Sequence, residues 1–186
     1  MRILACADLH GVAERFVRLR ELVGEHRPDV VVLAGDLGGC GGEGETLAAL
    51  DPLVTPVLAI GGNMDGPGVV ADLARRGWLL GGEPCVIDGV SFGSTNVVAP
   101  CDVLVAHIPP HGTLDVAPNG AHIGSRKVRD ALEQLHPRVL LCGHVHEMPG
   151  IERSGDTLVV NCSTGAGQAH GALIEIDGAN VSARLV

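Results

Sequence analysis

Short apolar runs alternate with helix-like segments through the first 76 residues. In the helix-like segments apolar residues recur at helical spacing between charged ones, whereas the runs are too short for helices and read as buried strands. Pro67 suits the first position of a helix. We expect strands at residues 3–7, 29–34 and 56–60, and helices from about Val12 to Gly24, over residues 44–50 and from Pro67 to about Arg76.

The second half of the chain is richer in predicted strands. Cys85–Ile87, the Asp88-Gly89 turn and the run from Val90 predict a hairpin. One helix is expected over residues 125–135, and further strands over residues 102–106, 139–142, 157–160, 172–176 and 180–185. Because no repeat or linker separates the halves, we expect one α/β domain spanning residues 1–186.

The composition limits which residues can form the core and which classes of partner the protein can bind. Hydrophobic residues make up 46% and aromatic residues 2%, so Val, Leu, Ile and Ala must build the core. The net charge of −9, the scattered Lys and Arg and the lack of Tyr disfavour nucleic-acid binding. No run has the length of a membrane span, and the six Cys form no CxxC pair. We expect a cytoplasmic protein with reduced thiols.

Polar side chains follow five predicted strands at the point where each strand ends. The carboxyl ends of strands are where sites assemble in α/β sheets. In an extended segment, residues i and i+2 project to the same side, so Asp8 with His10, and His144 with His146, should point together. The seven side chains are Asp8, His10, Asp36, Asn63, His107, His144 and His146.

Seven oxygen and nitrogen donors exceed what one tetrahedral zinc ion takes, and they suit two divalent ions that share a carboxylate. A set of Asp, Asn and His without thiolate favours Mn, Fe, Co, Zn or Ni over Ca or Cu(I), with Mn as the first choice.

The order of these motifs resembles a known superfamily. The chain carries DxH at Asp8, GD at Asp36, GNxD at Asn63, a lone His107 and GHxH at His144, in that order. This pattern resembles the calcineurin-like metallophosphoesterase superfamily, and residues 107–115, 124–125 and 143–147 resemble its small phosphodiesterase-like branch. The resemblance implies a four-layer α/β/β/α sandwich of two mixed β-sheets flanked by helices.

The resemblance also implies residue roles. Asp8, His10, Asp36 and His146 would hold one metal ion, and Asp36, Asn63, His107 and His144 the other. Asp36, Asn63 and His107 would be catalytic. A hydroxide bridging the two ions would attack phosphorus in line, without a covalent phosphoenzyme, and the substrates would be small phosphodiesters or nucleotides.

One position departs from the family pattern. Where the family often has a histidine that protonates the leaving group, this chain has Met64, and a thioether cannot donate a proton. Diesters with good leaving groups should therefore be favoured over monoesters. His111 or His122 could supply the acid or bind substrate together with Asn63, although solvent-exposed loop histidines are the simpler interpretation of both.

Several other residues have simpler interpretations. Arg126, Lys127 and Arg129 open the last helix, where a solvated face is favoured over contact with a substrate phosphate. Asp65 is expected to be structural, and a structural or incidental role is favoured over a functional one for Cys40. The alternative function is a non-catalytic metal-binding protein-interaction module, as in superfamily members that resemble the retromer subunit, but such proteins tend to lose ligand histidines that this chain keeps.

Overall fold

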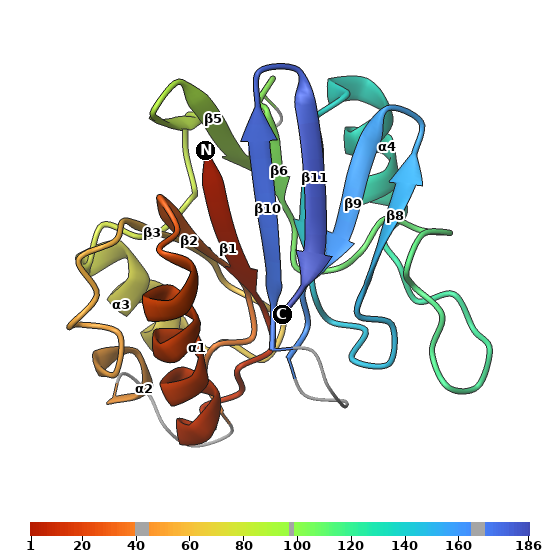
Figure 1. Ribbon diagram of the computed structural model, residues 1–186. Helices are drawn as coiled ribbons and strands as arrows, with labels where there is room; N and C mark the ends of the chain where they lie inside the picture. The colour runs from red at the N-terminus through yellow and green to blue at the C-terminus, as the bar shows by residue number, and fades with distance from the viewer. Residues whose placement is uncertain (40–44, 97–98, 165–169) are drawn as a thin grey trace.

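The computed structural model describes residues 1–39, 45–96, 99–164 and 170–186; Cys40 lies outside these ranges. Two β-sheets face each other at the centre of the molecule (Figure 1). The first sheet contains β1 (Arg2–Cys6), β2 (Val30–Ala34), β3 (Val57–Ile60), β10 (Ala172–Asp177) and β11 (Asn180–Leu185). Its strand order is β11-β10-β1-β2-β3, in which β1, β2 and β3 are parallel and β10 and β11 are antiparallel to their neighbours.

The second sheet is also mixed. Its strands are β4 (Cys85–Ile87), β5 (Val90–Ser94), β6 (Val103–Val105), β7 (Val139–Cys142), β8 (Gly150–Ser154) and β9 (Thr157–Asn161). The order is β4-β5-β6-β7-β9-β8, with parallel central pairs and antiparallel edge strands.

Helices cover the outer faces of both sheets (Figure 1). The first sheet packs against α1 (Ala13–His26), α2 (Glu45–Ala48) and α3 (Pro67–Arg75), and the second packs against α4 (Arg126–Leu135). The predicted four-layer α/β/β/α sandwich is therefore confirmed. In the described ranges, no helix combines the length and apolar character needed to cross a membrane.

Side chains of the central strands point alternately to the two faces of each sheet, which explains the layered arrangement. In β1, Ile3 and Ala5 face the core between the two sheets, whereas Leu4 and Cys6 face the helices, and all four are fully buried. Because neighbouring residues of a strand point to opposite faces, a continuous apolar run must be covered on both sides. The same alternation holds in β2 and β7.

The sequence missed one strand and misplaced one helix end. The edge strand β8 has mostly exposed side chains, so it lacks the apolar run by which the others were found. Helix α1 continues past Gly24 to His26 and ends where Arg27 takes a left-handed conformation, because a single glycine does not stop a helix that packs against a sheet.

Candidate metal centre

The seven candidate side chains meet at one edge of the sandwich, where strands of both sheets end. Asp8 and His10 follow β1, Asp36 follows β2 and Asn63 follows β3. From the second sheet, His107 follows β6, and His144 and His146 follow β7. The structure thus brings together residues that are up to 138 positions apart in the chain (146 − 8).

The first cluster contains Asp8, His10 and His146. The Nε2 atoms of His10 and His146 lie 3.1 Å apart, and the Oδ1 atom of Asp8 lies 3.3 Å from His146 Nε2 and 3.9 Å from His10 Nε2. Asp8 is fully buried, whereas both histidine side chains are partly open to solvent. Three donor atoms therefore converge on one point at the rim of the site.

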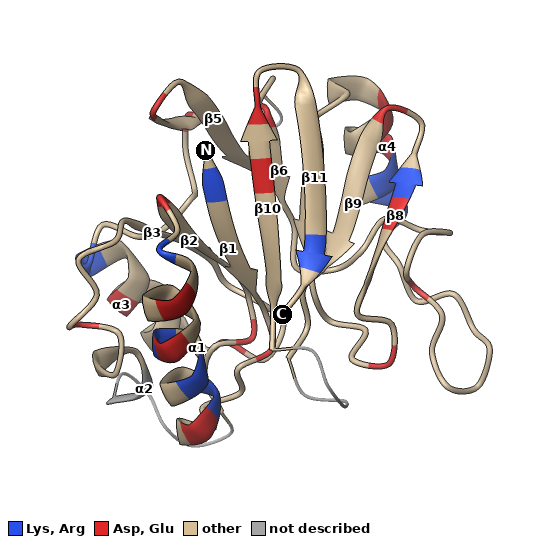
Figure 2. Cartoon of the chain, in the orientation of Figure 1, with Lys and Arg blue, Asp and Glu red and all other residues tan. Residues whose placement is uncertain are grey.

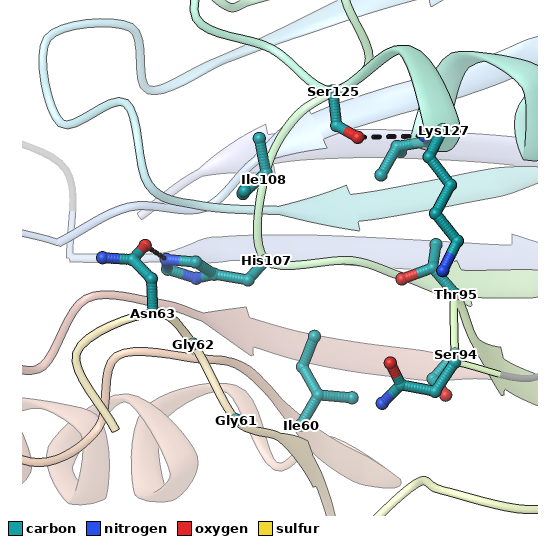
Figure 3. Close-up of a pocket in the computed structure, with 12 residues that line it drawn as sticks. Ile60, Gly61, Gly62, Asn63, Ser94, Thr95, His107, Ile108, Ser125 and Lys127 are labelled. Atoms are coloured by element: carbon teal, nitrogen blue, oxygen red, sulfur yellow. Dashed lines mark hydrogen bonds between the residues drawn. The ribbon is translucent and has the colours of Figure 1, made fainter. Parts of the chain in front are cut away.

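The second cluster is centred on His107. Its Nε2 atom lies 3.0 Å from Asn63 Oδ1 (Figure 3) and 3.2 Å from Asp36 Oδ2. The His144 ring packs edge-on against it, with 5.2 Å between the ring centroids. Donor atoms of Asp8, Asp36 and His107 lie within 4.8 Å of one another, so the two clusters are continuous.

Both clusters contain residues with a left-handed backbone conformation. Four of the eight described non-glycine residues with positive φ are candidate ligands: Asp8 (62°), His10 (50°), Asp36 (54°) and His144 (69°). Such conformations cost energy and cluster at functional sites. For this reason the expectation of an extended i, i+2 pair was wrong for His144 and His146, whereas Asp8 and His10 do point together, into the first cluster. His144 and His146 lie in a bend beyond β7 and pack against different partners, His107 and His10 respectively.

The donor atoms fit a bound cation. His107 Nδ1 lies 2.9 Å from the carbonyl oxygen of Ala34, which can only accept, so Nδ1 carries a proton. His107 Nε2 then faces two oxygen atoms, Asn63 Oδ1 and Asp36 Oδ2. In the charged imidazole Nε2 carries a second proton, and in the neutral imidazole it carries a lone pair. A metal ion would take the place of that proton, and a backbone carbonyl behind the ring is the usual support of a ligating histidine.

The pKa shifts follow from the same contacts. Burial acts to raise the pKa of Asp36, but hydrogen bonds from His107 and from the backbone N–H of Met64 hold it below its ordinary value. Burial acts to lower the pKa of His107, but the bonds to Asp36 and Ala34 raise it above its ordinary value. The pKa values of His10 and His144 are lowered, chiefly by burial. The neutral imidazoles of those two histidines are the form that a metal ion requires.

Comparison with known proteins shows the family of this chain. The profile of calcineurin-like phosphoesterases matches residues 1–148. This chain belongs to the calcineurin-like phosphoesterase family. An uncharacterized protein of Methanocaldococcus jannaschii, MJ1162, is 29% identical over an alignment 198 positions long that covers 88% of this chain and 88% of the other.

Solved structures share the fold. TT1561 of Thermus thermophilus superimposes with a TM-score of 0.73 at 14% identity, covering 99% of this chain and 98% of the other. A protein described as a novel archaeal phosphodiesterase gives a TM-score of 0.65 at 16% identity, with full coverage of both chains. At these identities the structures establish the fold alone. Family membership makes the protein a metal-dependent phosphoesterase in class, with candidate ligands in place.

The sequence missed a set of residues that support Asp8 of this phosphoesterase. Ser163 Oγ lies 2.6 Å from Asp8 Oδ2 and 2.7 Å from Asn161 Oδ1, and Thr164 Oγ1 donates to the carbonyl oxygen of Ala7. The backbone N–H of His144 donates to the same Asp8 carboxylate. Asn161 is the last residue of β9, and Ser163 and Thr164 follow it, so a search for polar residues at strand ends would have found all three.

The two loop histidines pair with their own loop. His122 Nδ1 lies 2.7 Å from Asp115 Oδ1, and the His111 and His122 ring centroids are 5.5 Å apart. Hydrogen bonds and ion pairs of the described residues connect neither of them to the seven candidate ligands.

A pocket of about 260 Å³ opens beside the second cluster, with Asn63 and His107 in its wall (Figure 3). The phosphoryl group and the rest of a small substrate can therefore be accommodated next to the candidate ligands.

Proposed function

We propose that this protein is a phosphoesterase with two divalent metal ions, held as the family pattern implies. Asp8, His10, Asp36 and His146 would hold one ion, and Asp36, Asn63, His107 and His144 the other. The observation that carries the proposal is the convergence of lone pairs at the two clusters, with buried Asp36 and Asp8 between them. We also propose that residues 1–186 form one domain, because both sheets contribute ligands.

Two bound divalent ions would activate water as a nucleophile and stabilise charge on the phosphoryl oxygens. The residues of this chain prepare that environment. The Ala34 carbonyl fixes the His107 ring, and the Met64 N–H donates to Asp36 Oδ1 at 2.7 Å. Asn63 turns its Oδ1 toward His107 and its Nδ2 away (Figure 3), so Nδ2 is free to donate to a phosphoryl oxygen.

Small phosphodiesters or nucleotides are the proposed substrates. The Met64 side chain, 46% exposed, cannot protonate a leaving group, so diesters with good leaving groups should react faster than monoesters. Lys and Arg are dispersed over α1, α3, α4, β8 and β11 (Figure 2), which supports small molecules over nucleic acid as substrates.

Manganese is the proposed metal because the donors are oxygen and imidazole nitrogen without thiolate; Fe, Co, Zn and Ni are the other candidates. A cytoplasmic location is also proposed, supported by the five free cysteines among the described residues.

The test is hydrolysis of bis-p-nitrophenyl phosphate and p-nitrophenyl phosphate by protein reconstituted with Mn²⁺. We expect the diester to be cleaved faster, with activity lost by on the order of 10²-fold or more in Asp36→Asn and His144→Ala. His26→Ala, which removes a histidine at the end of α1 beside Arg2, away from the candidate ligands, is the matched control and should retain activity. Stoichiometric metal binding without turnover of either ester would instead favour the interaction module.

A further inference from the structure

The pocket beside His107 has two polar ends and an apolar middle. Figure 3 shows Asn63 and His107 at one end, and Ser94, Thr95 and Lys127 at the other, with Ile60 and Ile108 between them. All of them belong to the pocket wall, which contains no acidic residue in the described part of the chain. The end remote from the metal ligands therefore presents hydroxyl groups and one ammonium group.

Ser94 marks that end as a binding site. It is the last residue of β5, its exposed fraction is 3%, and its Oγ has no hydrogen-bond partner in the part of the chain that the structure describes. Among the described residues no other buried side-chain oxygen or nitrogen lacks a partner. A buried hydroxyl without a partner is costly, and an unmet donor in a pocket wall indicates that a ligand completes it.

Lys127 brings a positively charged ammonium group to this end of the pocket. Its side chain runs from the first turn of α4 toward Thr95 (Figure 3), and within the described residues no ion pair or hydrogen bond engages its ammonium group. Arg129, by contrast, is committed to the carbonyl oxygen of His111 and to Ser154 and Thr113, and Arg126 is exposed outside the pocket. The three basic residues expected on one solvated face therefore differ: Arg126 is exposed to solvent, Arg129 is hydrogen-bonded within the protein, and only Lys127 faces the pocket.

We propose that this end of the pocket binds a second anionic group carried on the leaving group of the substrate. Ser94, Thr95 and Lys127 all present donors, which suits a carboxylate or phosphate. A short uncharged spacer would lie against Ile60 and Ile108 while the reacting phosphoryl group sits at Asn63 and His107. Hydrolysis adds water across the P–O bond, and the anionic group departs on the released alcohol. The inference rests on the proposed phosphoesterase function.

The test compares three diesters with the same reacting group: methyl 4-carboxyphenyl phosphate, its neutral 4-carbamoyl analogue and its 4-phosphono analogue. The protein with Mn²⁺ should show a higher kcat/KM for at least one anionic ester than for the neutral one. The anionic ester whose kcat/KM falls more in Lys127→Met identifies carboxylate or phosphate as the preferred group, because the leaving group is then the same in both measurements. Lys127→Met should reduce the anionic-to-neutral ratio by roughly tenfold, the effect of losing a hydrogen bond to a charged group.

Arg126→Met is the matched control, because it removes the same charge one residue away and outside the pocket. It should leave the anionic-to-neutral ratio unchanged. Ser94→Ala should reduce the ratio without lowering the Tm of the ligand-free protein, since the hydroxyl that it removes has no partner there.

The outcomes separate the two proposals. If all three esters are cleaved and the ratio is the same in wild type and Lys127→Met, or falls equally in Arg126→Met, the anionic subsite is wrong and the phosphoesterase stands. If no ester is cleaved with any of the candidate metals, both proposals are wrong.

Discussion

Asp36 can occupy its position because the residue packed against it, Gly62, has no side chain. A Cβ atom at Gly62 would overlap both the carboxylate and the backbone nitrogen of Asp36. The Met64 N–H, two residues further on, donates to that carboxylate. The glycine of the GNxD motif is therefore a requirement of close approach between the loops that follow β2 and β3.

Gly62→Ala should displace Asp36, weaken Mn²⁺ binding and abolish activity, with a loss of about 1–3 kcal/mol in the free energy of unfolding from overpacking. Gly24→Ala is the control, because Gly24 lies in α1 with open space around it, and there the same change should stabilise the protein by about 0.4–1 kcal/mol. Titration calorimetry and urea unfolding measure both effects. Wild-type metal affinity in Gly62→Ala would contradict this view of the site.

The pKa values of three site histidines predict a stability maximum for the metal-free protein near pH 6.5. Burial lowers the pKa of His10 and His144 below 6.5, so below that pH the unfolded chain binds more protons and stability rises with pH. For His107, burial is outweighed by the bonds to Asp36 and Ala34, and the pKa is raised above 6.5. Its contribution is complete below pH 6.5 and is lost as pH rises through the raised pKa.

Urea unfolding in the presence of a chelator, from pH 5 to pH 8.5, measures this profile. His107→Gln should remove the decline above pH 6.5 and keep the rise below it. The other shifted groups titrate elsewhere, since the pKa of Asp36 is lowered and burial raises that of Cys6 to about 12. Stability that climbs steadily to pH 8.5 in the wild type would show that His107 is not held as described.

Met64 predicts a strong dependence on the leaving group. Wild-type rates should fall steeply as the pKa of the leaving alcohol rises, because no acid occupies this position. Met64→His should increase the rates of the poorest leaving groups by about 10²-fold, the typical contribution of a positioned acid. A series of aryl methyl phosphates gives the slope for both proteins. Wild-type rates that do not vary with leaving-group pKa would contradict the prediction.

At the scale of elements, Asp65 connects the loops that follow β2 and β3. Its Oδ1 accepts from the backbone N–H groups of Leu37 and Gly38, and its Oδ2 accepts from that of Gly62. This agrees with the structural role expected from the sequence. The two loops that hold Asp36 and Asn63 are thus fixed to each other by one carboxylate.

Asp65→Asn should lower the free energy of unfolding by about 1–3 kcal/mol, because an amide N–H₂ group would face a backbone donor. Asp88→Asn makes the same chemical change in the exposed turn between β4 and β5, where Asn tolerates the positive φ, and should have little effect. Denaturant unfolding measures the free energy of unfolding of the two variants. Equal values for Asp65→Asn and Asp88→Asn would mean that the loops do not depend on Asp65.

The elements themselves were largely predictable. Doubly buried strands such as β1 and β7 are visible as apolar runs, and the residues at their ends include the candidate ligands. The exposed strand β8 was not visible, because its place in the sheet comes from pairing with β9 and not from its own side chains. The left-handed conformation of His144 was also unpredictable, since it is imposed by the packing around Gly143 and Asp8.

At the scale of the whole molecule, the site exists only because two sheets end at the same edge. Asp8, Asp36 and Asn63 come from the first sheet, and His107, His144 and His146 from the second. Motif order identified these residues without coordinates. Ser94 was not found because it belongs to no motif, and Lys127 was assigned to a solvated face; only the approach of β5 and α4 places the two residues in one pocket.

The central claim is that two ions share this edge, and anomalous diffraction from crystals soaked in Mn²⁺ tests it most directly. Two anomalous peaks are expected, one among Asp8, His10 and His146 and one among Asn63, His107 and His144, with Asp36 between them. Asp36→Asn should weaken or remove both peaks. A single peak, or manganese bound elsewhere with this edge empty, would contradict the account.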